Sequence, residues 1–127
     1  FIKRAHRARK LVGGAMRQAG VLAAACSVAL DTMVERLQED HDNAKLLADG
    51  LKNIPQLNVE PVESNMVFIS LKDGDADAFK ETLKKEGLLL GNVRHRIRMV
   101  THYGISKEDI KKAVDIVNRA VKEKASV

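Results

Sequence analysis

Arg17 lies in the stretch KLVGGAMRQAG, where the glycine pair Gly13 and Gly14 precedes it and an alanine-rich segment follows. Free backbone N–H groups and the positive dipole end at the start of a helix favour an anion there, and a guanidinium group adds to this preference. A phosphate or a carboxylate is therefore the candidate ligand. The alternative is a solvated first-turn arginine, and spacing alone does not decide between them. The glycines match neither a dinucleotide fingerprint nor a P-loop.

Arg98 lies in the segment HRIRMVTH, whose alternation predicts a strand with Arg98 on the opposite face from Ile97 and Met99. A guanidinium group at the end of a strand can hold a carboxylate through two parallel hydrogen bonds. The alternative is a charge on an edge strand that discourages sheet aggregation, which is the role predicted for Arg94 and Arg96. The sequence pattern by itself favours this alternative for Arg98 as well.

The histidines and the single cysteine do not form a pattern typical of a metal site. His41 falls on an apolar helical stripe, and His6 and His95 are predicted at the surface. His102 is a candidate for a supporting hydrogen bond, but no other potential ligand clusters with it in sequence. Cys26 is the single cysteine, so an intramolecular disulfide is excluded, and this favours a reducing, cytoplasmic compartment. Its setting among alanines predicts a small buried hydrophobic residue. We expect no transition-metal site.

The elements that must position these residues begin with a short basic helix or turn over residues 2–10 and a flexible joint near 12–15. From about residue 17 to 49, apolar and small residues recur at three- and four-residue steps, which predicts one long amphipathic helix, either straight or kinked. Gly50 is predicted to end it, because glycine readily adopts the left-handed conformation found after helices.

The remainder of the chain alternates strand and helix signals, which predicts an α+β layer sandwich. A helix through Glu86 is expected to stop at Gly87, and Ser106 with Asp109 resembles a capping box that starts a final helix. The predicted strands are LNVEPV, NMVFISL, LLLG (88–91) and HRIRMVTH (95–102).

The composition is that of one globular domain. The chain has 127 residues, of which 45% are hydrophobic and 31% charged, with a formal net charge of +5. No apolar run approaches the roughly 20 residues needed to span a bilayer. Because the chain starts with an apolar Phe1 and without Met, we expect it to be cut from a longer protein. The basic excess leaves a small anion- or nucleic-acid-binding domain as an alternative.

The segments FIKRAHRARKLVGGAMRQAGVLAAA, NMVF and IRMVTH, taken with ISKEDI, resemble the C-terminal portion of the low-specificity L-threonine aldolases. The resemblance runs from end to end, and KLVGGAMRQAG is its most specific part. One departure is Ala15, where many members of that family carry a third glycine. A serine hydroxymethyltransferase or a cysteine desulfurase could share the layout but is not expected to carry both motifs.

The resemblance implies the small C-terminal domain of a pyridoxal-phosphate-dependent enzyme of the aspartate-aminotransferase type. The implied activity is a carbon–carbon lyase that cleaves threonine or allo-threonine to glycine and acetaldehyde. On this basis Arg98 is expected to hold the substrate α-carboxylate. Arg17 and, less securely, Lys10 are expected to reach toward the cofactor phosphate and the active site of a neighbouring subunit.

The resemblance also implies what this chain lacks. The Schiff-base lysine, the acid at the pyridine nitrogen and the main phosphate loop of the family lie upstream of the matched region, so these 127 residues alone should be inactive. Upstream histidines and water are expected to act as the base, with His102 in a supporting role at most. Residues 1–16 are expected to lead in from a large cofactor domain, and 17–127 to form the small domain of a cytoplasmic homo-oligomer, a tetramer.

Overall fold

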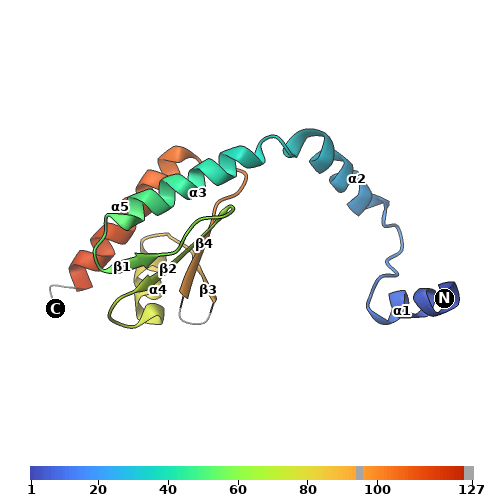
Figure 1. Cartoon of the computed structure of the whole chain (residues 1–127), viewed down its shortest axis with the longest axis horizontal. Coiled ribbons are helices and arrows are strands. Elements are labelled where there is room, and N and C mark those ends of the chain that lie inside the picture. The colour runs from blue at the N-terminus through green and yellow to red at the C-terminus, as the bar shows by residue number, and fades with distance from the viewer. Residues whose placement is uncertain (94–95, 125–127) are drawn as a thin grey trace. The chain divides into compact units, whose positions relative to one another are not determined.

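The structure, a computed structural model, describes residues 1–93 and 96–124 (Figure 1). The chain divides into two compact units, Phe1–Arg36 and Leu37–Val127. The predictions for Arg94 and His95 lie outside the described residues. No helix among the described residues is long and apolar enough to cross a membrane.

The unit Phe1–Arg36 consists of helices with almost no buried side chains. Helix α1 spans Ile2–Leu11, which confirms the predicted short basic helix, and Gly13 follows it with a φ of +80°. Helix α2 spans Gly20–Val28 and contains no buried residue. This unit therefore contributes little hydrophobic core of its own.

The long helix predicted from about residue 17 to 49 is interrupted. Helix α2 passes into a π-helical segment, η1, at Ala29–Met33, then a turn, and α3 begins at Leu37. The Thr32 hydroxyl donates to the carbonyl oxygen of Val28 at 2.8 Å. Such a bond inside a helix competes with the backbone pattern and favours a local bend, which a search for hydrophobic spacing does not detect.

Gly50 does not end helix α3, which spans Leu37–Lys52. Instead Gly50 is a point of close approach between two helices. A Cβ at this position would lie 2.7 Å from Cγ2 of Val114, on the C-terminal helix. The prediction that Gly50 ends the helix was wrong. Glycine is needed here because α3 and α5 approach closely and leave no room for a side chain, and not because the helix ends.

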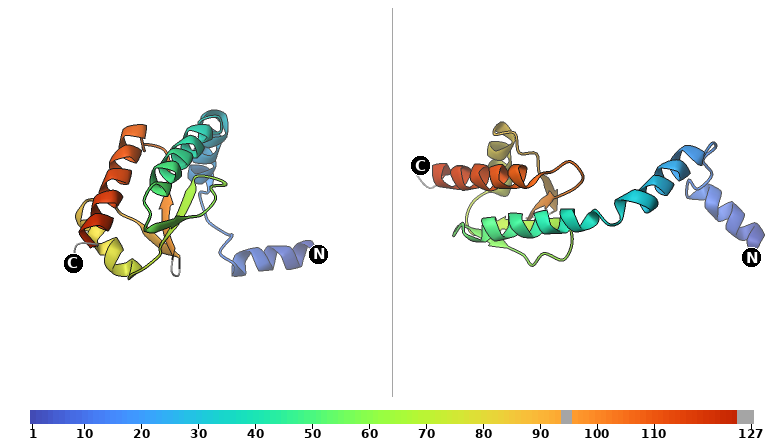
Figure 2. Two further views of the ribbon diagram at one scale, coloured as in Figure 1. Left: turned by 60° about the vertical axis from the view of Figure 1, so that its left-hand side comes forward. Right: turned by 90° about the horizontal axis from the view of Figure 1, so that it is seen from above.

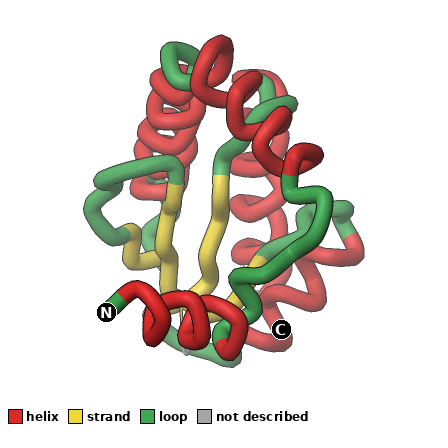
Figure 3. The backbone as a smooth tube through the Cα atoms, turned by 90° about the vertical axis from the view of Figure 1, so that its right-hand side faces the viewer, coloured by secondary structure: helices red, strands yellow, loops and turns green. Residues whose placement is uncertain are grey.

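The unit Leu37–Val127 contains a four-stranded antiparallel sheet in the order β1-β2-β4-β3 (Figures 1 and 3). The predicted strand LLLG was wrong for its first three residues, because β3 begins at Gly91. The strands are β1 Leu57–Val59, β2 Met66–Leu71, β3 Gly91–Val93 and β4 Arg96–Val100, and the further helices are α4 Ala76–Lys85 and α5 Lys107–Lys124.

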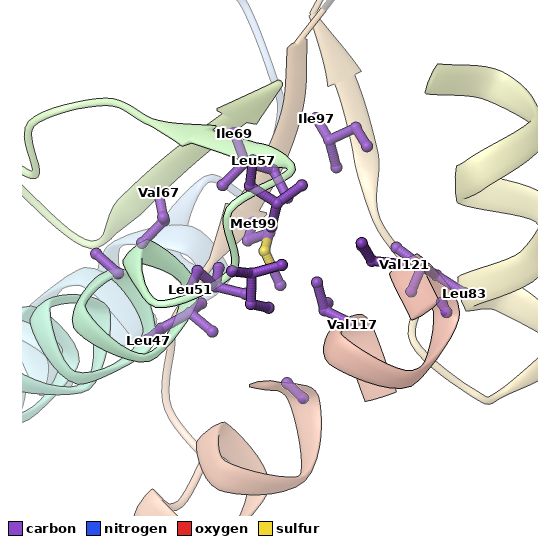
Figure 4. Close-up of a cluster of buried hydrophobic side chains, with 14 of the residues drawn as sticks. Leu47, Leu51, Leu57, Val67, Ile69, Leu83, Ile97, Met99, Val117 and Val121 are labelled. Atoms are coloured by element: carbon purple, nitrogen blue, oxygen red, sulfur yellow. The ribbon is translucent and has the colours of Figure 1, made fainter. Parts of the chain in front are cut away.

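The core lies between one face of the sheet and the helices. Figure 2 shows α3 and α5 side by side, and Figure 4 shows their apolar side chains pointing toward those of β2 and β4. Burying each Leu, Ile, Val or Phe contributes about 1.5–3 kcal/mol. The largest fully buried apolar side chains are Leu51, Val67, Ile69, Phe79, Leu83, Ile97 and Val117.

The predicted start of the last helix is confirmed in detail. The Asp109 backbone N–H donates to Oγ of Ser106 at 3.2 Å, and the Asp109 carboxylate accepts from the Ser106 backbone N–H at 3.1 Å. This reciprocal pair is a capping box. It fixes the start of α5, and so the loop that joins β4 to α5.

Candidate anion-binding site

The sheet has one face that its helices leave open. Along β4, Ile97 and Met99 are buried while Arg98 is exposed, which confirms the alternation predicted from the sequence. In the sheet register, Arg98 pairs with Phe68 of β2 on one side and Gly91 of β3 on the other. We call the sheet face that carries these three residues the open face.

The Arg98 guanidinium group lies over Gly91. A Cβ at position 91 would lie 3.5 Å from Nη2 and 3.6 Å from Nε of Arg98. Because glycine has no side chain, the guanidinium group can lie along β3 without meeting one. Within residues 1–93 and 96–124, no carboxylate pairs with Arg98. Its donors are thus available for an anion.

Arg96, two residues earlier on the same strand, is engaged. Its Nη1 donates to both carboxylate oxygens of Glu60, at 3.1 and 2.8 Å. Its guanidinium carbon also lies 4.7 Å from the centre of the Phe68 ring. The predicted role of Arg96, a charge on an edge strand that discourages sheet aggregation, was wrong, because β4 is an inner strand and Glu60 reaches Arg96 from the end of β1.

Three elements meet at Thr101, directly after β4. Its hydroxyl donates to the backbone oxygen of Asp40 in α3 at 2.6 Å. Its backbone N–H donates to the Asn65 oxygen at 3.0 Å, and Nδ2 of Asn65 donates back to the Thr101 oxygen at 2.7 Å. Because Thr101 is only 1% exposed, these bonds have little competition from water. They fix the end of the strand that carries Arg98.

The sequence analysis did not identify this role for Thr101 and Asn65, although both lie in the quoted motifs NMVF and IRMVTH. Glu60 was missed as well. The available signal for Glu60 was a carboxylate placed just after a strand and before Pro61, which is not specific. Which cation Glu60 pairs with depends on the strand order, and local sequence spacing does not predict the strand order.

His102 is exposed, and one of its ring nitrogens faces a backbone oxygen. Its Nδ1 lies 2.8 Å from the backbone oxygen of Tyr103, so Nδ1 is the protonated nitrogen in the neutral ring that donates to it. This leaves Nε2 as the acceptor. In the part of the chain that the structure describes, no three His, Cys, Asp or Glu side chains gather in a way that could hold a metal ion.

Arg17 and Lys10 lie in the unit Phe1–Arg36, and both are exposed. Lys10 is in the last turn of α1. Arg17 is in a turn before α2, next to Gln18, whose φ of +49° is left-handed. Neither cation has a carboxylate partner among the described residues. The chemistry of both side chains fits a phosphate group.

Comparison of the sequence with known families supports the resemblance noted above. A family described as beta-eliminating lyase matches residues 1–74. Low-specificity L-threonine aldolase 1 of Arabidopsis thaliana is 44% identical over 117 residues, which is 87% of this chain and 32% of that protein. The low specificity L-threonine aldolase of Escherichia coli K12 is 43% identical over 110 residues, with the same coverage. The chain thus spans about a third of the length of these curated relatives.

The solved structures support the fold. The chain is similar to Oryza sativa TDC with PLP and tryptamine, with a TM-score of 0.63 and 17% identity over 71% of this chain and 23% of that one. It is also similar to a C-DES mutant with glycine covalently linked to its PLP cofactor, with a TM-score of 0.60 and 19% identity over 66% of this chain and 23% of that one. These likenesses confirm the predicted α+β fold, and the family match extends over the glycine-rich segment, β1 and β2. The chain belongs to the beta-eliminating lyase family.

Proposed function

We propose that this chain is the C-terminal portion of a pyridoxal-phosphate-dependent aldolase that cleaves L-threonine and L-allo-threonine to glycine and acetaldehyde. The observation that carries the proposal is the exposed guanidinium group of Arg98, which lies over Gly91 without a carboxylate partner among the described residues. The chain that carries Arg98 is 44% identical to a low-specificity L-threonine aldolase.

Arg98 binds the α-carboxylate of the amino acid in this proposal. A planar guanidinium group can donate two parallel hydrogen bonds to a carboxylate, which fixes the direction of the substrate as well as its position. The rigidity of the strand matters here, because a misplaced carboxylate would misalign the bond to be broken. Thr101 and Asn65 supply that rigidity at the end of β4.

Arg17 and Lys10 are the residues of this chain that would hold the cofactor phosphate. Arg17 would make the main contact and Lys10 a weaker one. Both are exposed cations without an acidic partner in the described residues, and Arg17 stands just before the N-terminus of α2. Pyridoxal phosphate, when bound, withdraws electrons from the carbon where the bond breaks. No lysine of this chain is assigned to the cofactor's covalent attachment, so the 127 residues alone are expected to be inactive.

The assembly in this proposal is a cytoplasmic homotetramer. Its support is the unit Phe1–Arg36, in which Met33 and Arg36 alone are half-buried and every other residue is exposed. Apolar surface on that scale is typical of an interface. The exposed large apolar residues of this unit are Phe1, Ile2, Leu11, Val12, Met16, Val21, Leu22, Val28, Leu30 and Val34.

The test is acetaldehyde release from L-allo-threonine by the intact protein that contains this chain, with and without added pyridoxal phosphate. Cofactor-dependent release is the expected result. No release by a folded, cofactor-loaded protein would reject the aldolase activity and favour another amino-acid substrate. Steeply salt-dependent binding of this chain to nucleic acid, with no release, would favour the nucleic-acid-binding alternative.

A further inference from the structure

The two arginines of β4 on the open face have opposite surroundings. Arg96 turns toward β2, where its guanidinium group lies on the Phe68 ring and bonds to Glu60. Arg98 turns toward β3 and lies over Gly91. One of the two guanidinium groups is therefore already neutralised by a carboxylate of the chain itself, and the other has no such partner within residues 1–93 and 96–124.

The spacing of these arginines would suit a ligand with two carboxylates if both were free. Residues i and i+2 of a strand project on the same face about 7 Å apart along it. Without its bonds to Glu60, the long Arg96 side chain could turn back over β4, and two guanidinium groups near that separation could bind both ends of a four-carbon dicarboxylate. A substrate held by Arg96 would also be displaced along the strand from the position that Arg98 sets.

Glu60 is held where it can prevent the binding of a second ligand carboxylate by Arg96. Its backbone N–H donates to the carbonyl oxygen of Phe68 at 3.0 Å, which keeps it beside β2. A pocket of about 280 Å³ adjoins the Phe68 ring and is lined by Glu60 and Glu63 among others. These two carboxylates make this end of the open face unfavourable for a second carboxylate of a ligand, while the Arg98 end stays favourable.

We propose that Glu60 is a specificity-determining residue. By holding Arg96 on Phe68, it leaves Arg98 as the one of the two guanidinium groups that no carboxylate of the described residues neutralises, and so selects ligands with one carboxylate over ligands with two. The inference rests on the proposed function, in which Arg98 receives the substrate carboxylate. It adds a substrate class, amino acids with an uncharged side chain, and a reason why acidic amino acids are disfavoured.

The experiment uses inhibition of L-allo-threonine cleavage in the intact protein by two four-carbon acids, butyrate and succinate. The variants are Glu60→Gln, Glu60→Ala, Arg96→Gln and the double variant Glu60→Gln/Arg96→Gln. In Glu60→Gln and Glu60→Ala, the inhibition constant for succinate should fall about tenfold, because a second guanidinium group becomes available. The inhibition constant for butyrate should stay within twofold of the wild-type value. The double variant should return to the wild-type value for succinate.

Arg96→Gln is the matched control: it removes the second guanidinium group and leaves the Glu60 carboxylate without its partner, so the succinate constant should not fall below the wild-type value. A succinate constant that stays within twofold of wild type in both Glu60 variants would show that the inference is wrong. So would a tighter succinate constant that persists in the double variant, because the effect would then not pass through Arg96.

A second measurement separates this inference from the proposed function. Succinate and butyrate are titrated into the 127-residue chain while the side-chain Nε–Hε signals of Arg96 and Arg98 are followed by NMR. In Glu60→Gln, succinate should shift both signals at about a tenth of the concentration needed in wild type. Equal titration curves would reject the inference even if the intact protein cleaves threonine. The expected curves would support it even if cleavage is absent and the aldolase activity fails.

Discussion

Thr101 donates its hydroxyl proton to the backbone oxygen of Asp40 at 2.6 Å, and this bond joins the end of β4 to the first turns of α3. The bond is buried and spans 61 residues of sequence. Three residues before Thr101, on the same strand, Arg98 faces away from the core. The proposed carboxylate-binding residue thus belongs to a strand whose end is tied to a helix, and not to a free loop.

Replacing Thr101 by Val should destabilise the chain by about 1–3 kcal/mol, because the shape is nearly kept but the buried hydrogen bond from the Thr101 hydroxyl to the Asp40 oxygen is lost. Urea unfolding followed by circular dichroism measures this. Thr101→Ser keeps the hydroxyl, so its free energy of unfolding should fall clearly less than that of Thr101→Val. A larger loss for Ser than for Val would show that the methyl packing of Thr101, and not its hydrogen bond, matters at this position, because valine keeps the methyl group and serine does not.

Gly50→Ala should destabilise the chain by about 1–3 kcal/mol, although alanine is the better helix former by about 1 kcal/mol. The reason is the new Cβ, which would lie 2.7 Å from Cγ2 of Val114 and force α3 and α5 apart. Adding Val114→Ala should restore part of the loss. The matched control is Gly20→Ala in α2, where a Cβ would meet nothing within 4 Å, and this variant should be neutral or stabilising. A stabilised Gly50→Ala chain would contradict the close approach.

The pH dependence of stability should contain a contribution from Asp109. The Ser106 hydroxyl and then its backbone N–H donate to the Asp109 carboxylate and hold its pKa below the ordinary value of 3.8, with burial opposing and Lys112 assisting. A lowered folded pKa stabilises the fold above the unfolded pKa, and this contribution is lost as the pH falls through the folded pKa.

Urea midpoints of wild type and Asp109→Asn, compared from pH 6 down to pH 3, test this contribution. The difference in urea midpoint between wild type and Asp109→Asn should be largest near pH 6 and should shrink below about pH 3.8. Asp115→Asn, on an exposed position of the same helix, serves as the control and should show a smaller difference. A difference for Asp109→Asn that does not change with pH would contradict the assigned cause.

Arg98→Lys in the intact protein should raise KM for threonine about tenfold or more, with cofactor retention unchanged, because an ammonium group cannot make the paired hydrogen bonds of a guanidinium group. Steady-state kinetics and the cofactor absorbance after dialysis give the two readings. Arg119→Lys, on an exposed position of α5 that pairs with Glu86, is the control and should change neither. Unchanged kinetics in Arg98→Lys would remove Arg98 from the site.

Arg17→Ala should weaken cofactor binding more than substrate recognition, with Lys10→Ala showing a smaller effect of the same kind. The measurement is the fraction of pyridoxal phosphate retained by the intact protein after dialysis. Arg4→Ala, an exposed cation of α1 outside the glycine-rich stretch, is the matched control. Full retention in the Arg17 variant would count against a phosphate contact.

Local patterns determined much of this protein without the structure. Two-residue alternation placed Arg98 on the face opposite Ile97 and Met99, because successive side chains of a strand must point to opposite faces. The Ser106 and Asp109 spacing located the start of α5, because a capping box needs contacts only within one helical turn. The motif resemblance located Arg17 and Lys10 as cofactor-binding candidates, and these two assignments stay predictions.

The tertiary structure decided what depends on partners distant in sequence. Gly50 looked like a helix end, but Val114 of another helix explains the glycine. Arg96 and Arg98 look alike in the sequence, and only the strand order β1-β2-β4-β3 brings Glu60 to one and Gly91 to the other. Periodicity determines which face a side chain takes, but the free energy of an ion pair or a steric contact depends on distances across strands and helices, which sequence spacing does not contain.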